Sequence, residues 1–351
     1  MLRRLLLFSL VASLTIPAAA QPAGPVWSAP STTQVLTEDK TFDRVGIKLA
    51  GKLYLPRASG KVPAVVVFHG ASSPLQSEVL YDHLKRMLPP LGVAVFTYDR
   101  RGTGKSTGKA SGNDYEILAD DGIAAAQMLA GDPRIDSRRI GFWGLSQGGW
   151  LTLLAASRYK PTAFAISISA PMVTPDVQMK FAVANILRIK GYSQADIDLA
   201  IAARAAVDDF MRGRLDRATA QARLDAAASK PWFGLIYMSK SFNDPDKSGW
   251  AKEIRHDPLT SIGAISAPTL IIYGSGDPWV PAALSMDRLQ ELTRKRANFD
   301  AVVVNGADHS MRTTATLEQQ IDPAFFPRQA PDSVEYFGRL AAWLKRQGIA
   351  K

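Results

Sequence analysis

The sequence predicts an α/β protein with a mostly parallel, doubly wound sheet and a helical cap insertion. Short continuous runs of apolar, often β-branched residues recur along the chain, as expected for strands buried on both faces. Stretches with apolar residues at helical spacing separate these runs, and such alternation predicts a parallel sheet covered on both faces. The predicted strands are residues 62–68, 93–98, 139–143, 163–169, 269–273 and 300–304.

The remaining elements follow from the same patterns. A hairpin of two antiparallel strands is predicted at residues 45–56, where apolar residues alternate around a glycine. Residues 172–256 show no strand pattern, and their Ala-rich segments predict a helical cap over the sheet, with Ser193 and Asp196 as a capping pair. The alternative is a surface appendage without a catalytic role. The predicted core helices are residues 77–88, 115–130, 148–157, 281–296 and 333–347.

The first 20 residues have the build of a secretory signal peptide. Arg3 and Arg4 precede an apolar stretch, and three alanines at residues 18–20 form a cleavage point before Gln21. The alternative is an uncleaved anchor, but the apolar stretch is short for a membrane span. We therefore expect a periplasmic or secreted protein. The predicted organisation is signal peptide 1–20, linker 21–36, core 37–171 and 257–351, and cap 172–256.

Composition excludes several classes of protein. The 351 residues include no cysteine, which rules out disulfides, cysteine nucleophiles and thiolate metal sites. The net charge is +10, but basic residues alternate with acidic ones and no basic run is interleaved with aromatic residues, so no nucleic-acid partner is expected. No apolar run after the N-terminus is long enough to span a membrane. No metal or cofactor is predicted, and the sequence does not set the oligomeric state.

A G-x-S-x-G motif marks the candidate nucleophile. Residues 144–148 read Gly-Leu-Ser-Gln-Gly, directly after a predicted strand and at the start of a predicted helix. A sharp strand-to-helix turn strains the backbone at Ser146, flanking glycines relieve crowding, and the hydroxyl is left exposed above the sheet. The alternative is a chance Gly-Ser-Gly turn, which this context disfavours.

A serine nucleophile needs a base, and the chain offers four histidines. His309 follows the last predicted strand, so it belongs at the same sheet edge as Ser146. His83 falls inside a predicted helix and is expected on the surface, whereas His256 is expected in a local turn. His69 precedes the serine and is expected to shape a loop. Elimination and the order Ser, Asp, His favour His309.

The third member orients the imidazole and stabilises its charged form. Asp277 follows the strand at residues 269–273 and lies between serine and histidine in sequence. Asp308 is the main alternative, but neighbouring loop residues rarely point at one another. Asp257 precedes a proline and is the weaker alternative, since Asp-Pro commonly opens a turn.

Two backbone N–H groups are needed to hold a developing oxyanion. Gln147 follows the nucleophile and is expected to supply one of them. Gly70 and Ala71 follow the strand at residues 62–68, where the glycine lets the backbone approach closely. The N–H of Ala71 is therefore expected to be the second donor.

Together these motifs resemble the α/β-hydrolase superfamily from about residue 40 to the C-terminus. A further shared stretch, Asp99-Arg100-Arg101-Gly102-Thr103-Gly104-Lys105-Ser106, is similar to the serine aminopeptidase, dienelactone-hydrolase-like and dipeptidyl-peptidase-like branches. In those families the stretch is structural, so the resemblance implies that Asp99 and Arg101 hold a loop. It also implies metal-independent hydrolysis of an acyl bond, without deciding between esterase, peptidase and thioesterase.

The cap is expected to select a small-molecule acyl substrate. Its apolar residues could line a pocket for a medium-sized acyl group, or could merely pack the cap on the core. No concentration of Asp or Glu in the cap stands ready for a substrate ammonium, so a carboxylic ester is favoured over a peptide or amide. A thioesterase and a non-catalytic binding protein are further alternatives. The apolar cap residues are Met172, Met179, Phe181, Ile186, Leu187, Phe210, Trp232, Phe233 and Met238.

Overall fold

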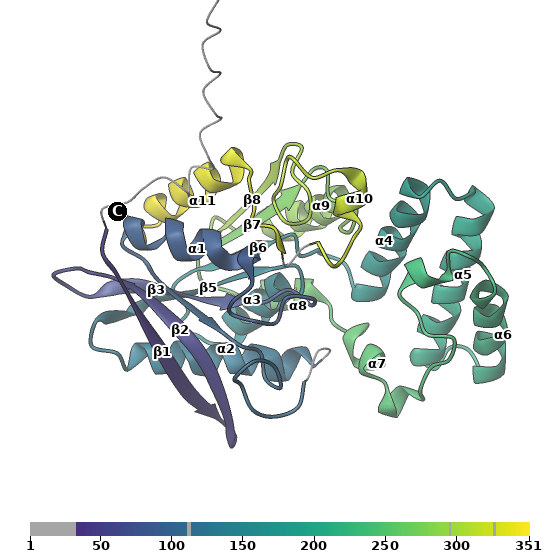
Figure 1. Ribbon diagram of the computed structural model, residues 1–351, viewed down its shortest axis with the longest axis horizontal. Coiled ribbons are helices and arrows are strands. Elements are labelled where there is room, and N and C mark those ends of the chain that lie inside the picture. Colours follow the sequence, from purple (N-terminus) through teal and green to yellow (C-terminus); the bar gives the residue numbers. More distant parts are fainter. Residues whose placement is uncertain (1–32, 111–113, 295, 326–327) are drawn as a thin grey trace, which may run out of the picture.

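The computed structural model describes residues 33–110, 114–294, 296–325 and 328–351, and within these ranges eight strands form one sheet (Figure 1). The strand order is β1-β2-β4-β3-β5-β6-β7-β8. Strands β1, β2 and β4 pair antiparallel, and the remaining neighbours pair parallel, which confirms the predicted α/β fold. The strands are β1 (Val35–Arg44), β2 (Ile47–Pro56), β3 (Val62–Phe68), β4 (Ala94–Tyr98), β5 (Ile135–Leu145), β6 (Ala165–Ile168), β7 (Thr269–Gly274) and β8 (Phe299–Val304).

Strand β3 illustrates why the apolar runs are continuous. All of its residues are buried. Val65 and Val67 belong to one hydrophobic cluster, whereas Val66 and Phe68 belong to another. Successive side chains of a strand point to opposite faces of the sheet, so an unbroken apolar run is needed where helices cover both faces.

Helices α1 and α11 contribute to the cluster of Val65 and Val67, and α2, α3 and α8 contribute to that of Val66 and Phe68, on the opposite face of the sheet (Figure 1). Leu289 places α9 in the second of these clusters. In the described part of the chain, no helix combines the length and apolar character required to cross a membrane. The core helices are α1 (Asp82–Met87), α2 (Tyr115–Ala130), α3 (Gln147–Arg158), α8 (Pro258–Ala264), α9 (Ala282–Thr293), α10 (Leu317–Gln320) and α11 (Val334–Arg346), with 3-10 turns η2 (Val79–Tyr81) and η3 (Pro89–Leu91).

The N-terminal hairpin lies earlier in the chain than predicted. It joins β1 to β2 through Val45 and Gly46, whose φ angles are 50° and 74°. Gly51, which lies within the segment predicted as a hairpin, falls inside β2, where a Cβ atom would lie 2.8 Å from Cε2 of Phe96. Close packing, not a turn, therefore requires glycine there. Strand β1 begins within the segment predicted to be a linker, and the predicted signal peptide lies outside the described residues.

The segment between β6 and α8 is helical and has its own hydrophobic cluster, which includes Val183, Leu187, Ile197, Leu224 and Trp232. Its helices α4, α5 and α6 project to one side of the sheet (Figure 1). The Ser193 hydroxyl accepts a hydrogen bond from the Asp196 N–H, as the capping spacing predicts. The elements are α4 (Pro175–Ile189), α5 (Gln194–Met211), α6 (Arg217–Ala228), η4 (Phe233–Ile236), η5 (Pro245–Lys247) and α7 (Gly249–Glu253).

Candidate active site

Ser146 occupies the tight turn between the end of β5 and the start of α3. Its φ and ψ angles are 59° and −123°, which side-chain-bearing residues adopt only under strain. Two backbone hydrogen bonds hold this conformation: Ser146 N–H donates to the Ile168 carbonyl at 2.8 Å, and Gly149 N–H donates to the Ser146 carbonyl at 2.8 Å. The turn therefore fixes the hydroxyl at the carboxyl edge of the sheet.

The glycines around Ser146 are required by close packing of the backbone. A Cβ atom on Gly144 would collide with the carbonyl of Gly148, two residues beyond the serine in the first turn of α3. A Cβ atom on Gly148 would lie 2.8 Å from the carbonyl carbon of Phe68 at the end of β3. The G-x-S-x-G spacing therefore lets β3, β5 and α3 meet closely beneath the serine.

His309 and Asp277 meet at the same edge of the sheet. Asp277 follows β7 and His309 follows β8, and the His309 Nδ1 lies 2.8 Å from the Asp277 Oδ2. The other carboxylate oxygen accepts hydrogen bonds from the N–H groups of Trp279 at 2.7 Å and Val280 at 3.2 Å. These donors satisfy the buried carboxylate and fix its orientation toward the imidazole.

The electrostatics around His309 favour its protonated form. Burial opposes protonation, but the charge of Asp277, its hydrogen bond to the ring and the charge of Asp308 outweigh burial. The pKa of His309 is therefore raised above its usual 6.5. The surroundings of His309 therefore stabilise the imidazolium that forms when the ring takes a proton from a serine hydroxyl.

Asp308, the alternative to Asp277, points elsewhere. Its Oδ1 accepts hydrogen bonds from the N–H groups of Ser310 and Arg312, both at 2.8 Å. This carboxylate therefore shapes the turn that carries His309, while Asp277 contacts the ring. Asp257, the other alternative, accepts from the Leu259 N–H and caps α8.

The other three histidines are structural. His83 is fully buried, contrary to the expected surface position, because α1 packs under α11: its Nε2 lies 3.0 Å from the Tyr336 hydroxyl. Burial lowers the pKa of His83 to about 3. His69 lies edge-on between the rings of Tyr81 and Tyr98, both 5.2 Å away. His256 packs edge-on against Tyr115 and Trp150, with ring centroids at 5.0 Å and 5.6 Å, and lines a pocket behind the active-site wall.

The loop expected to supply an oxyanion donor is braced from two sides. The Gly70 N–H donates to the Tyr81 hydroxyl at 3.0 Å, and that hydroxyl donates to the Ser73 carbonyl at 2.9 Å. Arg100, which sequence reasoning missed, donates to the His69 carbonyl at 2.8 Å. These bonds hold Ala71 at the cavity wall beside Ser146. Gln147 begins α3, whose first-turn N–H groups are directed out of the helix.

The stretch at residues 99–106 holds this region in place. The two carboxylate oxygens of Asp99 accept from the N–H groups of Gln76 at 3.0 Å and Lys105 at 2.9 Å. The Arg101 Nε donates to the buried Asp121 at 2.6 Å. Asp99 and Arg101 therefore have the loop-holding contacts that the family resemblance implied.

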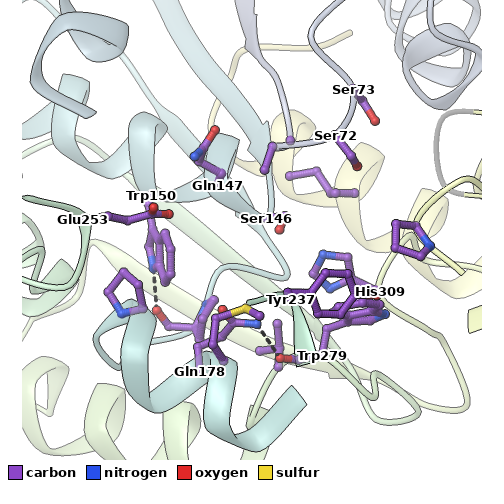
Figure 2. A pocket seen from close by; sticks show the side chains of 18 of the residues that line it. Ser72, Ser73, Ser146, Gln147, Trp150, Gln178, Tyr237, Glu253, Trp279 and His309 are labelled. Atoms are coloured by element: carbon purple, nitrogen blue, oxygen red, sulfur yellow. Dashed lines mark hydrogen bonds between the residues drawn. The ribbon is translucent and has the colours of Figure 1, made fainter. Parts of the chain in front are cut away.

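A cavity of about 400 Å³ lies above Ser146 between the core and the cap (Figure 2). Among the apolar cap residues considered from the sequence, Met179 lines it. Most of the others belong to hydrophobic clusters, so they serve packing, which was the alternative to lining a pocket. Within the described ranges, no three His, Asp or Glu side chains gather to hold a metal ion. The lining residues include Ala71, Tyr115, Ser146, Gln147, Trp150, Gln178, Met179, Tyr237, Trp250, Glu253, Trp279, Val280 and His309.

One residue that lines the cavity is a cap carboxylate that the sequence analysis did not single out. Glu253, the last residue of α7, lines the cavity and accepts a hydrogen bond from the Tyr115 hydroxyl at 2.6 Å. Burial raises the pKa of Glu253, an effect that Tyr115 and the charge of Arg204 oppose. No local motif marks this residue in the sequence, because its position depends on where α7 docks against α2.

The sheet order, the strained serine turn and the His309–Asp277 pair define an α/β hydrolase. The model of the alpha/beta hydrolase family matches residues 65–318, and the chain belongs to this family. Family membership supports hydrolytic activity.

Two curated relatives illustrate the similarity in sequence. Thiohydrolase aneE of Aspergillus aculeatus is 33% identical over 138 residues, which is 37% of this chain and 42% of that protein. The chain thus spans less than half the length of this relative. Protein Rv2307c of Mycobacterium tuberculosis is 26% identical over 226 residues, or 64% of this chain and 78% of that protein.

Solved structures show the same fold. The α/β hydrolase GrgF of Penicillium sp. sh18 superposes with a TM-score of 0.56 at 20% identity, covering 89% of this chain and 99% of that one. The Pyrococcus furiosus esterase Pf2001 gives a TM-score of 0.56 at 18% identity, covering 89% and 91%. At such identities the similarity establishes the fold, and the substrate has to be argued from the site.

Proposed function

We propose that this protein is a serine hydrolase that cleaves a carboxylic ester through an acyl-enzyme, with Ser146 as nucleophile, His309 as base and Asp277 as the orienting acid. The observation that carries the proposal is the His309–Asp277 pair, 2.8 Å apart, whose imidazole lines the same cavity as Ser146. A serine at a strained turn beside a carboxylate-bound imidazole is the arrangement that activates a hydroxyl.

The reaction has two symmetrical halves. The Ser146 Oγ attacks the ester carbonyl carbon while the His309 Nε2 takes the hydroxyl proton. The N–H groups of Ala71 and Gln147 donate to the oxyanion that develops on the carbonyl oxygen. The C–O bond to the alcohol then breaks, and the alcohol leaves with the proton from His309. A water molecule, deprotonated by the same imidazole, releases the acid and regenerates Ser146.

The cavity walls support a small-molecule acyl substrate. The volume of about 400 Å³ falls within the usual range of ligand pockets, roughly 300–1,000 Å³. Trp150, Trp279, Val280 and Met179 give these walls a largely apolar and aromatic character. Thioester cleavage is the second candidate, favoured by the similarity to the thiohydrolase aneE. A peptidase or amidase of the same fold, and a binding protein without activity, are the remaining alternatives.

Active-site labelling tests the proposal. A fluorophosphonate should add to Ser146 in the wild-type protein and should not add to Ser146→Ala, whose turnover should fall on the order of 10⁶-fold. Matched esters, thioesters and nitroanilides of one acyl group should show the highest kcat/KM for the ester. A faster thioester or amide would replace the ester in the proposal, and a protein inert to all three and to the phosphonate would be a binding protein.

We further propose that the mature protein begins at Gln21 and is periplasmic or secreted. The positively charged start, the short apolar stretch and the alanines at 18–20 support this. N-terminal sequencing of the protein from fractionated bacterial cells should read from Gln21 in the periplasm or medium. An intact N-terminus in the cytoplasm would contradict the proposal.

A further inference from the structure

Glu253 and His309 lie on opposite sides of Ser146 in the cavity (Figure 2). His309 must deliver a proton to the leaving alcohol, so the alcohol part of the ester lies on the His309 side of the nucleophile. The acyl part then extends toward the opposite side, where Glu253 lies. The mechanism proposed above makes no use of this carboxylate.

The surroundings of Glu253 leave its charge without a direct partner. Within the described residues, no Lys, Arg or His nitrogen forms an ion pair with this carboxylate, and Tyr115 supplies its one side-chain hydrogen bond. The neighbouring Lys252 pairs with Asp114 at 3.5 Å. The Arg204 guanidinium donates to the Ile236 carbonyl at 2.6 Å. A carboxylate withdrawn from water in this way is stabilised by a cation that enters the cavity.

The walls beside Glu253 suit a protonated amine. Trp150 and Trp250 line the same cavity, and indole faces attract cations, as the Arg204 guanidinium 5.6 Å from the Trp250 ring centroid illustrates. Tyr115 orients one oxygen of the carboxylate and also interacts with the Gln147 side chain, which links Glu253 to the residue after the nucleophile. A neutral hydroxyl could bond the carboxylate but would leave its charge uncompensated.

We propose that the acyl part of the substrate carries a protonated amine that binds Glu253, so that the favoured substrates are esters of amino acids or of longer amino-substituted acids. This inference rests on the proposed acyl-enzyme function. It assigns Glu253 as the specificity residue and Tyr115 as its positioning residue.

The Tyr115–Glu253 hydrogen bond has a purely structural alternative. It joins α2 of the core to α7 of the cap, and the Lys252–Asp114 pair joins the same two segments. Glu253→Gln separates the two roles, because the amide oxygen still accepts from Tyr115 while the charge is lost. Glu116→Gln is the matched control. Glu116 follows Tyr115 on α2, but its side chain is exposed and pairs with Arg158 outside the cavity.

The experiment compares methyl esters that differ by one ammonium-for-methyl exchange: alaninate with 2-methylpropanoate, 3-aminopropanoate with butanoate, and 4-aminobutanoate with pentanoate. Acid release gives kcat/KM for each. The wild type and Glu116→Gln should prefer the amino ester in at least one pair. Glu253→Gln should lower that preference about tenfold or more, as expected for a lost charged hydrogen bond.

A second measurement needs no variant. An alkylammonium ion should protect Ser146 of the wild type from the phosphonate better than the alcohol of equal chain length. Equal protection by the two compounds overturns the inference. So does an ester series in which the wild type shows no preference for the amino ester, or in which Glu253→Gln keeps the wild-type preference. If the neutral esters are still cleaved and Ser146 is still labelled, the esterase proposal stands alone; if neither occurs, the esterase proposal falls first.

Discussion

Asp308, which adjoins His309, should make the stability of the protein depend on pH. The side chain is fully buried. Its Oδ1 accepts two backbone hydrogen bonds, whereas no donor among the described residues reaches its Oδ2. Burial raises the pKa of Asp308 to about 6, against the opposing effect of the Arg312 and Ser310 N–H groups and the charge of His309. The substitution Asp308→Asn keeps an oxygen for both N–H groups and removes the titrating proton.

The size and sign of the effect follow from linkage. A pKa of about 6 in the folded protein, against 3.8 for an ordinary Asp, corresponds to about 3 kcal/mol of differential stability. Because the folded-state pKa is raised, this stability is present below pH 4 and is lost as the pH rises through 6. Part of this stability is already lost at pH 4, so between pH 4 and pH 7 the wild type should lose about 2 kcal/mol of unfolding free energy relative to Asp308→Asn.

Urea unfolding at intervals between pH 4 and pH 7 measures this difference for the wild type and the variant. The comparison uses only how the free-energy difference between the two proteins changes with pH. A pH-independent cost of burying the amide of Asp308→Asn therefore does not affect it. Asp43→Asn, which removes an exposed carboxylate from β1, should keep the wild-type pH profile. A free-energy difference between wild type and Asp308→Asn that stays constant across this range would refute the burial argument.

Three further substitutions test how the site is held. Asp277→Asn should lower kcat about 10⁴-fold and move the acidic limb of kcat/KM to lower pH, since it removes the charge that raises the pKa of the histidine; a limb that stays in place contradicts this. Tyr81→Phe leaves the Gly70 N–H without its acceptor, so the free energy of unfolding measured with denaturant should fall by about 1–3 kcal/mol. The kcat of this variant should fall more than its KM rises, and an unchanged kcat would show that this loop does not contribute to catalysis. Gly148→Ala places a methyl group 2.8 Å from the Phe68 carbonyl carbon, so phosphonate labelling should slow and Tm should fall; wild-type labelling would show that the turn can shift.

Features with a local sequence cause were predictable. The run at Val62–Phe68 has to be apolar throughout because β3 contacts two layers, and the strand was predicted with these bounds. The residues flanking Ser146 are glycines because backbone atoms meet there, and this requirement is visible in the motif itself.

Features that depend on how distant segments dock were not predictable. A hairpin was predicted at residues 45–56, yet Gly51 in this segment lies inside β2, where glycine is needed to admit the Phe96 ring of β4. His83 is buried only because α11, more than 240 residues later, closes over α1 through Tyr336. Glu253 enters the cavity because α7 returns to Tyr115 across 138 residues of chain. One-dimensional patterns carry no signal for such contacts.

A crystal structure of the phosphonate-treated protein tests the proposed chemistry most directly. We expect phosphorus bonded to the Ser146 Oγ, one phosphonyl oxygen within hydrogen-bond distance of the N–H groups of Ala71 and Gln147, and the His309 ring still bonded to Asp277. Phosphorus on any other residue, or a phosphonyl oxygen directed away from both N–H groups, would contradict the mechanism.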